Sequence, residues 1–467
     1  MINAIIKLIT FFMFLKTNFY KNKKIHRVCL LCVFVLASLH PPFANAKVPD
    51  VGLSAQQPVF AHSPAFLRLL WQKVTLEHPQ AQTQLQTLKS TGFEVAISEQ
   101  AFYPTPSITL ERAQSAGSFD PSYAGDPQVM TFRLQQPLWT GGRLTAQSTK
   151  ALANQKIEMA RMVEVQQGLA LKTLQTWLEL VSAQRQHSTL MRTQAQQQAL
   201  LSSIERRAAQ GVSSVSEANF SRLRMLQVAQ DMAQAKLMEE QAWIKLKQWV
   251  PQAELLATST SHTQVSHEAV HLEPLALHNW DALSWSQSPA AARFAGLLEV
   301  QAAELQEKKA MLQPEVYVRA EHQRGNFTYA NAPSVNRIFV GLSASTGAGM
   351  SLQHQLAALQ TKQDATQLDM EATQRQLWES VQSDLLTVRA RQSKVQALAF
   401  NLQSSQDIQT AWQRQFESGR KSWIEVMNAV RESSQAELAI IENDVALQLS
   451  FWRLQINAFG LTPWTSP

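Results

Sequence analysis

The feature that most constrains the fold of this chain is an internal duplication. Landmarks of the same character recur in the same order at offsets of 207–210 residues: His78-Pro79 and Ser288-Pro289, Pro104 and Pro314, Gly142 and Gly349, and Gly211 and Gly419. A chain that repeats itself in this way is expected to fold as two similar halves. We therefore predict a first repeat over residues 47–250, a connector over 251–286, a second repeat over 287–460 and a C-terminal tail over 461–467.

Each half contains two segments in which apolar and polar residues alternate. The segments span about 106–115 and 129–139 in the first half, and about 315–324 and 336–346 in the second. A period of two predicts β-strands with one apolar face. On that face we expect six lipid-facing residues: Met130, Phe132, Leu134, Ile338, Val340 and Leu342.

The remainder of each half is typical of long helices. From Gly142 to about Ala209 there is no proline, and a helix of that length would extend ~100 Å at about 1.5 Å per residue. Apolar residues within it follow the spacing of a coiled-coil seam. The predicted fold class is therefore mainly α with a small β part, built from a duplicated helix-strand-strand-helix-helix half.

Two short motifs with identical spacing separate the predicted long helices of each half. They are Gly211-x-x-Ser214-x-x-Glu217 and Gly419-x-x-Ser422-x-x-Glu425. A glycine in the left-handed conformation ends a helix, and a serine with a glutamate three residues later forms a capping box for the next. We predict helical hairpins with tips at about 210–214 and 418–422. Good capping alone explains each motif, but its recurrence in both halves favours a functional use.

The N-terminal residues 1–46 have the pattern of a secretory signal peptide. The basic cluster Lys21–Arg27 precedes the apolar run Val28–Leu39 and then Ala44-Asn45-Ala46. An uncleaved N-terminal anchor is the alternative. The segment holds six basic residues and no acid, so the rest of the chain has 36 basic and 36 acidic residues, which gives no electrostatic case for nucleic-acid binding.

Four strands with an apolar face cannot cross a bilayer by themselves, because every strand edge in lipid must be paired. Membrane barrels have about eight strands or more, so several copies must contribute to one barrel. The long helices, rich in uncharged polar residues, would continue such a barrel as a tube.

The residues also resemble a known family, the TolC-type outer-membrane factors. The resemblance rests on the duplication, the two tips, the segment Gln136-Pro137-Leu138-Trp139-Thr140-Gly141-Gly142-Arg143-Leu144, and the closing Phe451-Trp452-x-Leu454 with Ala458-Phe459-Gly460-Leu461. It implies a homotrimer with a 12-stranded β-barrel in the outer-membrane lipid of a Gram-negative bacterium and a periplasmic α-helical barrel.

The function that the resemblance implies is a passive exit duct, without enzymatic activity or cofactor. It would serve tripartite efflux or type I secretion, together with a periplasmic adaptor protein and an inner-membrane ABC, RND or MFS transporter. The cargo stays open. The segments Trp139–Arg143 and Ser345–Gly349 slightly favour members that export adhesins.

The resemblance also assigns roles to the tips. Adaptor contacts fall on Gly211, Ser214, Glu217, Gly419 and Ser422. The periplasmic gate falls on Glu425, Asn428 and Lys421. Three Glu425 side chains around an axis would repel anions, bind cations and tend to have raised pKa values. Asn428 replaces an acidic residue, so a second charged ring is not expected, and Lys421 is expected to pair across helices. A plain capping role for Glu425 stays open.

Two other functions are compatible with parts of the sequence. His267-Glu268-Ala269-Val270-His271 matches the zinc-protease pattern H-E-x-x-H, which requires a helix. Pro274 follows at once and a third ligand is not evident, so we predict no catalytic or metal site. A secreted coiled-coil scaffold without a pore would explain the helices, but it would not explain the alternating strands.

Overall fold

The computed structural model describes residues 65–113, 125–251, 285–344 and 351–459. The predicted signal peptide, the His267–His271 motif, residues 345–349 and the predicted tail therefore lie outside the described residues, as does nearly all of the predicted connector. The domain limits that involve these segments stay predictions.

The described chain is mainly helical with one small antiparallel sheet, which confirms the predicted fold class. The first half contains α3 (Ala65–Glu77), α4 (Pro79–Gln100), β1 (Thr105–Arg112), β2 (Gln128–Trp139), α5 (Arg143–Ala209) and α6 (Val215–Trp249). The second half contains α9 (Pro289–Ala310), β3 (Glu315–Arg324), β4 (Val335–Ser343), α10 (Ser351–Glu417) and α11 (Trp423–Phe459).

The two halves match closely in the lengths of their helices. Helices α4 and α9 each have 22 residues, and α5 and α10 each have 67. Proline opens both shorter helices, where its missing N–H costs no hydrogen bond. The residue before it caps the helix in each case, through the imidazole of His78 or the hydroxyl of Ser288.

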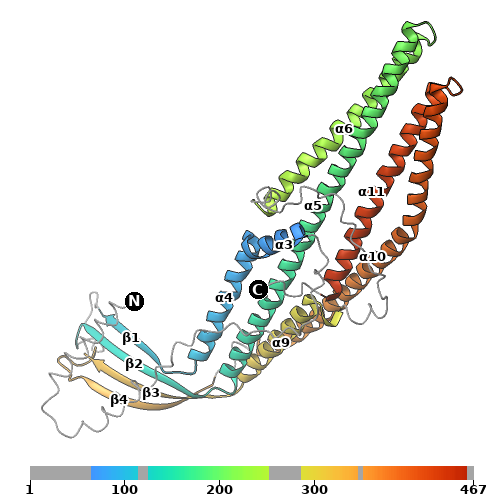
Figure 1. Cartoon of the computed structure of the whole chain (residues 1–467). Helices are drawn as coiled ribbons and strands as arrows, with labels where there is room; N and C mark the ends of the chain where they lie inside the picture. Colours follow the sequence, from blue (N-terminus) through green and yellow to red (C-terminus); the bar gives the residue numbers. More distant parts are fainter. Residues whose placement is uncertain (1–64, 114–124, 252–284, 345–350, 460–467) are drawn as a thin grey trace. The chain divides into compact units, whose positions relative to one another are not determined.

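The sheet has the order β1-β2-β3-β4, and all neighbouring strands are antiparallel (Figure 1). Leu134 lies between Pro106 of β1 and Ala320 of β3, and Ala320 lies opposite Ile338 of β4. Directly opposed residues share a face of an antiparallel sheet. The register therefore places all six predicted lipid-facing residues on a single face.

The alternation of apolar and polar residues is interrupted at the end of β2. The register shifts between Pro137 and Trp139, so that Trp139 lies opposite Val316. A bulge of this kind adds a residue to one strand and reverses the alternation beyond it. Trp139, rather than Leu138, therefore continues the apolar row, and its side chain is half exposed.

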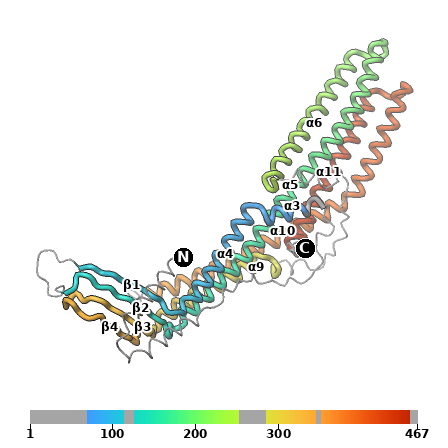
Figure 2. The backbone as a smooth tube through the Cα atoms, turned by 60° about the vertical axis from the view of Figure 1, so that its left-hand side comes forward, coloured from blue at the N-terminus to red at the C-terminus, as the bar shows by residue number. Residues whose placement is uncertain are grey.

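The long helices run in pairs. Helix α5 lies along α6, and α10 lies along α11, in both views of the chain (Figures 1 and 2). Helix α5 also contacts α4, α9 and α11. Since α5 connects the sheet with the first hairpin tip in one uninterrupted helix, it is the element that relates the two regions of functional interest.

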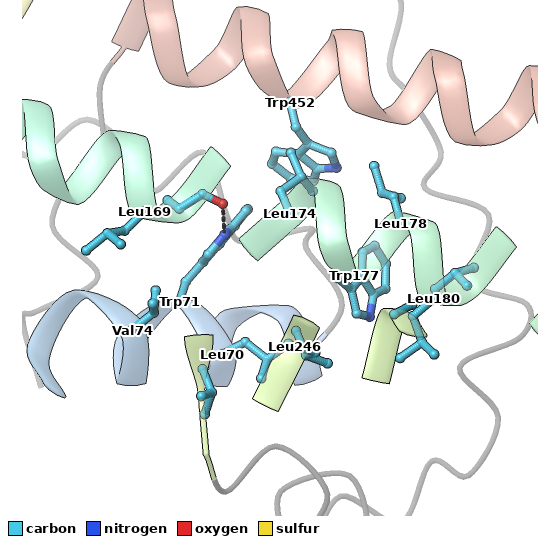
Figure 3. Close-up of a cluster of buried hydrophobic side chains, with 14 of the residues drawn as sticks. Leu70, Trp71, Val74, Leu169, Leu174, Trp177, Leu178, Leu180, Leu246 and Trp452 are labelled. Atoms are coloured by element: carbon cyan, nitrogen blue, oxygen red, sulfur yellow. Dashed lines mark hydrogen bonds between the residues drawn. The ribbon is translucent and has the colours of Figure 1, made fainter. Parts of the chain in front are cut away.

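The main hydrophobic core lies where α3, α5, α6 and α11 meet (Figure 3). The rings of Trp71 and Trp452 pack edge to face with centroids 5.8 Å apart. The indole Nε1 of Trp71 donates to the carbonyl oxygen of Ala170 at 2.9 Å. A buried tryptophan with a satisfied N–H combines a large apolar contact area with a fixed orientation, so this core fixes α3 and α11 against α5.

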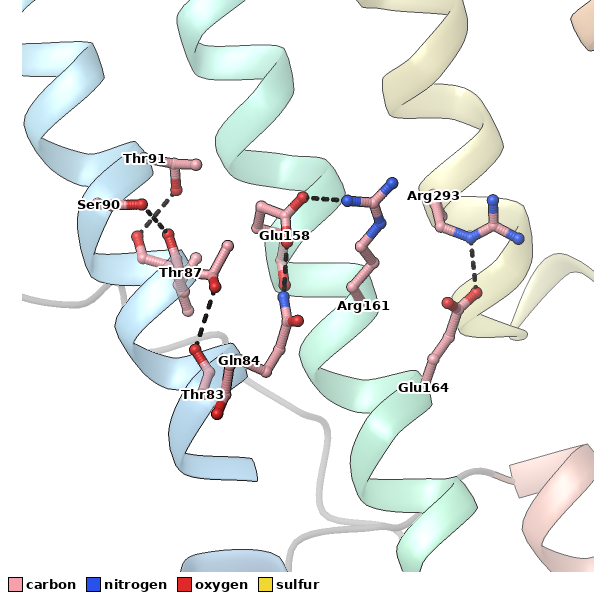
Figure 4. A network of polar contacts seen from close by, with 10 residues as sticks. Thr83, Gln84, Thr87, Ser90, Thr91, Glu158, Arg161, Glu164 and Arg293 are labelled. Atoms are coloured by element: carbon pink, nitrogen blue, oxygen red, sulfur yellow. Dashed lines mark hydrogen bonds and ion pairs between the residues drawn. The ribbon is translucent and has the colours of Figure 1, made fainter. Parts of the chain in front are cut away.

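Polar contacts fix the shorter helices against α5 (Figure 4). The amide of Gln84 in α4 donates to the carboxylate of Glu158 at 2.6 Å, and Arg161 pairs with the same carboxylate at 2.5 Å. Arg293 of α9 pairs with Glu164 at 2.9 Å. Glu158 is buried, and its two partners compensate its charge, as a buried carboxylate requires.

Among the residues that the structure describes, none of the helices has a stretch long and apolar enough to cross a lipid bilayer.

Candidate functional site

The first candidate region is the apolar face of the sheet, which is the more exposed face. Ile338, Val340 and Leu342 of β4 are 76%, 75% and 69% exposed, and Ile108 and Leu110 of β1 are 68% and 69% exposed. Soluble proteins rarely expose contiguous apolar surface of this kind, which marks a membrane or partner contact. The predicted residues of β2 lie on the same face, but Met130 and Leu134 are only partly exposed.

The sheet is also open at both sides within the described chain. Strand β1 pairs only with β2, and β4 pairs only with β3. Each edge strand therefore has a row of backbone N–H and C=O groups without strand partners. Apolar edge strands that expose these groups are suited to pairing with another chain.

The opposite face of the sheet carries charges. In its middle, Arg133 of β2 and Arg319 of β3 approach the same Glu321 oxygen at 3.5 and 3.6 Å. The guanidinium of Arg319 stacks on the ring of Phe339 with its carbon 4.6 Å from the ring centroid. Arg337 of β4 lies opposite Glu321 and donates to the side-chain oxygen of Gln323 at 3.3 Å. We call Arg133, Arg319, Glu321 and Arg337 the arginine cluster.

The arginine cluster was not among the residues predicted from the sequence, although its signal is present there. The arginines occupy the polar positions of three strands that the alternation had already identified, but the strand register that brings them together is not readable from spacing.

A glycine turn joins the sheet to α5. Gly141 and Gly142 have φ values of 61° and 88°, in the left-handed region that side chains other than glycine rarely adopt. Arg143, the first residue of α5, then pairs with Glu315 at the start of β3 at 2.6 Å. The Trp139–Arg143 segment thus has a structural role at this turn, so its presence carries little information on cargo.

The second candidate region is the first hairpin tip, between α5 and α6. Gly211 has a φ of 74°, and the amides of Val212 and Ser213 donate to the carbonyl of Arg207 at 2.9 and 3.2 Å. The Ser214 hydroxyl accepts from the Glu217 amide at 3.2 Å, and the Glu217 carboxylate accepts from the Ser214 amide at 3.1 Å. The local geometry is the capping box that the sequence predicts.

The second tip, between α10 and α11, has a related but denser set of contacts. Gly419 has a φ of 75°. One oxygen of Glu425 accepts from the amide and hydroxyl of Ser422 at 3.0 and 2.9 Å. The other oxygen pairs with Lys421 at 2.7 Å, and the Lys421 ammonium lies 4.4 Å from the ring centroid of Trp412.

These contacts determine the electrostatics of Glu425. The hydrogen bond from Lys421, followed by those from Ser422, lowers the pKa of Glu425 from 4.5 to about 2. Within one chain, three donors stabilise the charged form of this carboxylate. The raised pKa expected for three Glu425 side chains around an axis concerns an assembly of three copies and stays a prediction. In the single chain Lys421, which lies just before α11, pairs with Glu425 in the first turn of that helix. A pair across helices in the closed trimer stays a prediction. Asn428 is exposed on the same helix.

The two tips pack against each other. Leu200, Ile204 and Ala218 of the first hairpin form a buried cluster with residues of the second: Phe416, Trp423, Val426 and Met427. The guanidinium of Arg207 stacks on the Phe416 ring with its carbon 4.7 Å from the centroid. Glu425 therefore projects from a well-packed base, which suits a side chain that acts at a fixed position.

Within the described ranges, no group of three or more His, Cys, Asp or Glu residues is arranged to bind a metal ion. The predicted H-E-x-x-H pattern lies outside those ranges, so the structure does not test it.

Comparisons with known proteins agree with this architecture. A family model described as "Outer membrane efflux protein" matches residues 70–250. A comparison with curated proteins finds no significant match.

Several solved structures share the fold. The outer-membrane channel CmeC of Campylobacter jejuni is 14% identical, with 87% of this chain and 88% of that chain covered at a TM-score of 0.73. VceC of Vibrio cholerae is 14% identical, with 84% of this chain and 96% of that chain covered at a TM-score of 0.70. The open state of the MtrE channel of Neisseria gonorrhoeae is 14% identical, with 85% of this chain and 89% of that chain covered at a TM-score of 0.67. At this identity the likeness shows the fold.

The sheet, the paired long helices and the two tips give this chain the fold of these solved outer-membrane channels. Residues 70–250 are similar to the outer membrane efflux protein family, whose model matches them. The family resemblance and the predicted outer-membrane location are thereby confirmed.

Proposed function

We propose that three copies of this chain form a channel that passively conducts substrate from an inner-membrane transporter across the periplasm and outer membrane. The observation that carries the proposal is the four-stranded sheet with an exposed apolar face and two unpaired edges. In lipid, such a sheet is stable only if its edges pair, and pairing β1 of one copy with β4 of the next closes a barrel. Three copies give the twelve strands expected from the resemblance.

The helices support the same arrangement. Helix α5 begins at Arg143, with three residues between it and the end of β2, and it continues for 67 residues to the first tip. The tips then present capped, tightly packed hairpin ends, which we propose as the adaptor-contacting surface. The proposed gate residues lie beside the second tip, with Glu425 in the first turn of α11.

Cysteine crosslinking tests the proposed strand pairing. Both natural cysteines, Cys29 and Cys32, lie in the predicted signal peptide, so cysteines introduced into β1 and β4 would be the only thiols of the mature chain. Ser107→Cys combined in turn with each polar-face position of β4 should yield, at one register, covalent dimers and trimers after oxidation.

Ser107→Cys combined with Ile338→Cys is the matched control, because the two residues lie on opposite faces of the sheet. It should give no crosslinked trimer. A chain that crosslinks at none of the β4 positions, and that is an elongated oligomer in detergent-free buffer, would instead support the pore-free scaffold.

The choice between efflux and secretion rests on the transporter that supplies the channel. We propose an exit duct that serves either system through an adaptor, with an ABC, RND or MFS transporter as the energy source. Co-purification of the intact trimer with each candidate adaptor from the same genome separates these possibilities.

A further inference from the structure

We infer that the arginine cluster makes the barrel end of the channel selective for anions, and that its cargo carries carboxylate, phosphate or sulfate groups. The inference rests on the proposed function, because the apolar face must meet lipid for the opposite face to line the passage. That opposite face holds Arg133, Arg319, Glu321 and Arg337 in the middle of the sheet.

The cluster has an excess of positive charge. Three arginines surround one glutamate, which gives a net charge of +2 in each copy. The other charged residues on this face, Glu111 and Glu315, lie towards opposite ends of the strands, and Glu315 is already paired with Arg143 at 2.6 Å. In a trimer the excess would be repeated three times around the passage.

The positive charge of the arginines is only weakly compensated within the cluster. Arg133 and Arg319 contact Glu321 at 3.5 and 3.6 Å, well beyond the ~2.8 Å of a good charge-assisted hydrogen bond. The Nε atoms of both are buried without a hydrogen-bond acceptor. Arg337 has only the neutral Gln323 oxygen as a polar partner among the described residues. Guanidinium groups of this kind match the geometry of carboxylate and phosphate.

The positions of the arginines are fixed by the fold. Arg319 is stacked on Phe339, and the directly opposed residues Arg133, Glu321 and Arg337 lie on three adjacent strands with defined register. A preorganised set of charges focuses the electrostatic potential in a passage with low-dielectric walls.

The reversal potential of the trimer in a planar bilayer under a potassium chloride gradient tests the inference. Because Glu425 acts in the opposite sense, the decisive quantity is the change in the chloride-to-potassium permeability ratio between variants. Arg337→Gln should lower this ratio by about twofold or more, and the effect should increase at low salt, where screening is weaker. Arg337→Lys keeps the charge and should leave the ratio near the wild-type value.

Arg324→Gln is the matched control, since Arg324 lies opposite Met130 on the apolar face of the same sheet. It removes the same charge and should leave the ratio unchanged. Arg337 makes no ion pair among the described residues, so its replacement is not expected to prevent folding. If Arg337→Gln forms open channels with an unchanged chloride-to-potassium permeability ratio, the inference of anion selectivity is wrong, but the proposed channel function still holds. If the purified trimer shows no conductance, the proposed function itself is wrong.

Discussion

Gly141 lies so close to Gln313 that a methyl group on Gly141 would stand 2.7 Å from the Cβ of Gln313. The same methyl group would stand 3.1 Å from the carbonyl oxygen of Ala310. The turn that leads from β2 into α5 is therefore packed against the end of α9 and the residues that precede β3. Only glycine satisfies both this contact and the positive φ of the turn.

We expect Gly141→Ala to lower the free energy of unfolding by more than about 2 kcal/mol, since a left-handed backbone conformation alone costs alanine about 1–2 kcal/mol. Gly142→Ala is the matched variant, because a methyl group there meets nothing within 4 Å. Gly142→Ala should therefore lower the free energy of unfolding only by the cost of the left-handed backbone conformation. Thermal unfolding of the purified protein in detergent measures both, and equal losses would show that the contact with Gln313 is unimportant.

Gly168→Ala should have the opposite effect. Gly168 lies inside α5, and a methyl group there has open space. Alanine in a helix interior is roughly 0.5–1 kcal/mol more stable than glycine. A higher unfolding midpoint is therefore expected, and a lower midpoint would indicate that the helix must bend or be approached closely at this position in the assembled protein.

The sequence was sufficient to predict the elements, because their periods are strong and each occurs twice. The 67-residue helices, the four strands and the glycine turns at 211 and 419 all follow from local chemistry. The bulge before Trp139 was missed, since one added residue leaves no mark in an alternating pattern.

The electrostatics of the site were less predictable. The spacing of Ser422 and Glu425 indicated a cap, but the lowered pKa depends also on Lys421, whose side chain was expected to reach another helix. Similarly, the arginine cluster depends on the pairing of β2 with β3, which places Arg133 opposite Glu321, 188 positions later in the chain. Contacts of this range are set by the fold and not by local pattern.

Asp126 provides a test of the loop region next to the sheet. Its two carboxylate oxygens accept hydrogen bonds from the amides of Asn326 and Asn331, both at 3.0 Å. Asp126→Ala should cost about 1–3 kcal/mol, because removing the acceptor leaves backbone donors unpaired. Faster proteolytic cleavage between Asn326 and Val335 is the expected readout.

Asn331→Gly is the matched control for Asp126→Ala. Glycine at position 331 keeps the backbone N–H donor and readily adopts the φ of 57° found there. The cleavage rate of this variant should stay close to that of the wild type. Equal cleavage rates in Asp126→Ala and the wild type would show that the loop is held by other contacts.

The second tip should respond to acid in a defined range. A carboxyl whose pKa is lowered by folding stabilises the folded state above its unfolded pKa and loses that effect as the pH falls towards its folded pKa. For Glu425 the loss should occur between about 4.5 and about 2. The amide hydrogen-exchange rates of the first turn of α11 are compared between the wild type and Glu425→Gln at each pH. The rates of the two proteins should differ at pH 6 and become equal near pH 2. A difference in exchange rate that does not change with pH would contradict the lowered pKa of Glu425 as the cause.

Glu425→Gln should also change ion conduction if Glu425 lines the periplasmic gate. Three carboxylates around one axis would bind polyvalent cations, and the lowered pKa keeps them charged at neutral pH. We expect weaker block by such cations in single-channel recordings of the variant. Glu217→Gln at the first tip is the matched control, because it removes the equivalent cap. Unchanged block in Glu425→Gln would leave the residue with a capping role only.

Asp384 supplies a final prediction, at the contact between α10 and α11. Its side chain is buried, and desolvation raises its pKa, although Arg453 at 3.3 Å and Ser450 act in the opposite direction. Burial is the largest influence because Arg453 is itself 40% exposed and its charge is partly screened by water. The folded state therefore favours the neutral carboxyl, so the stability contributed by this group is highest at low pH and is lost as the pH rises through its folded pKa.

Asp384→Asn removes the buried charge while it keeps the size of the side chain. The variant should match or exceed the wild-type unfolding midpoint at pH 7, and its advantage should narrow as the pH falls through the folded pKa of the wild-type carboxyl. Asp444→Asn, which breaks a more exposed pair with Arg185, is the control and should change the free energy of unfolding by at most about 1 kcal/mol. If Asp384→Asn were instead less stable at pH 7 than at pH 4 relative to the wild type, the ion pair with Arg453 would outweigh the cost of burial.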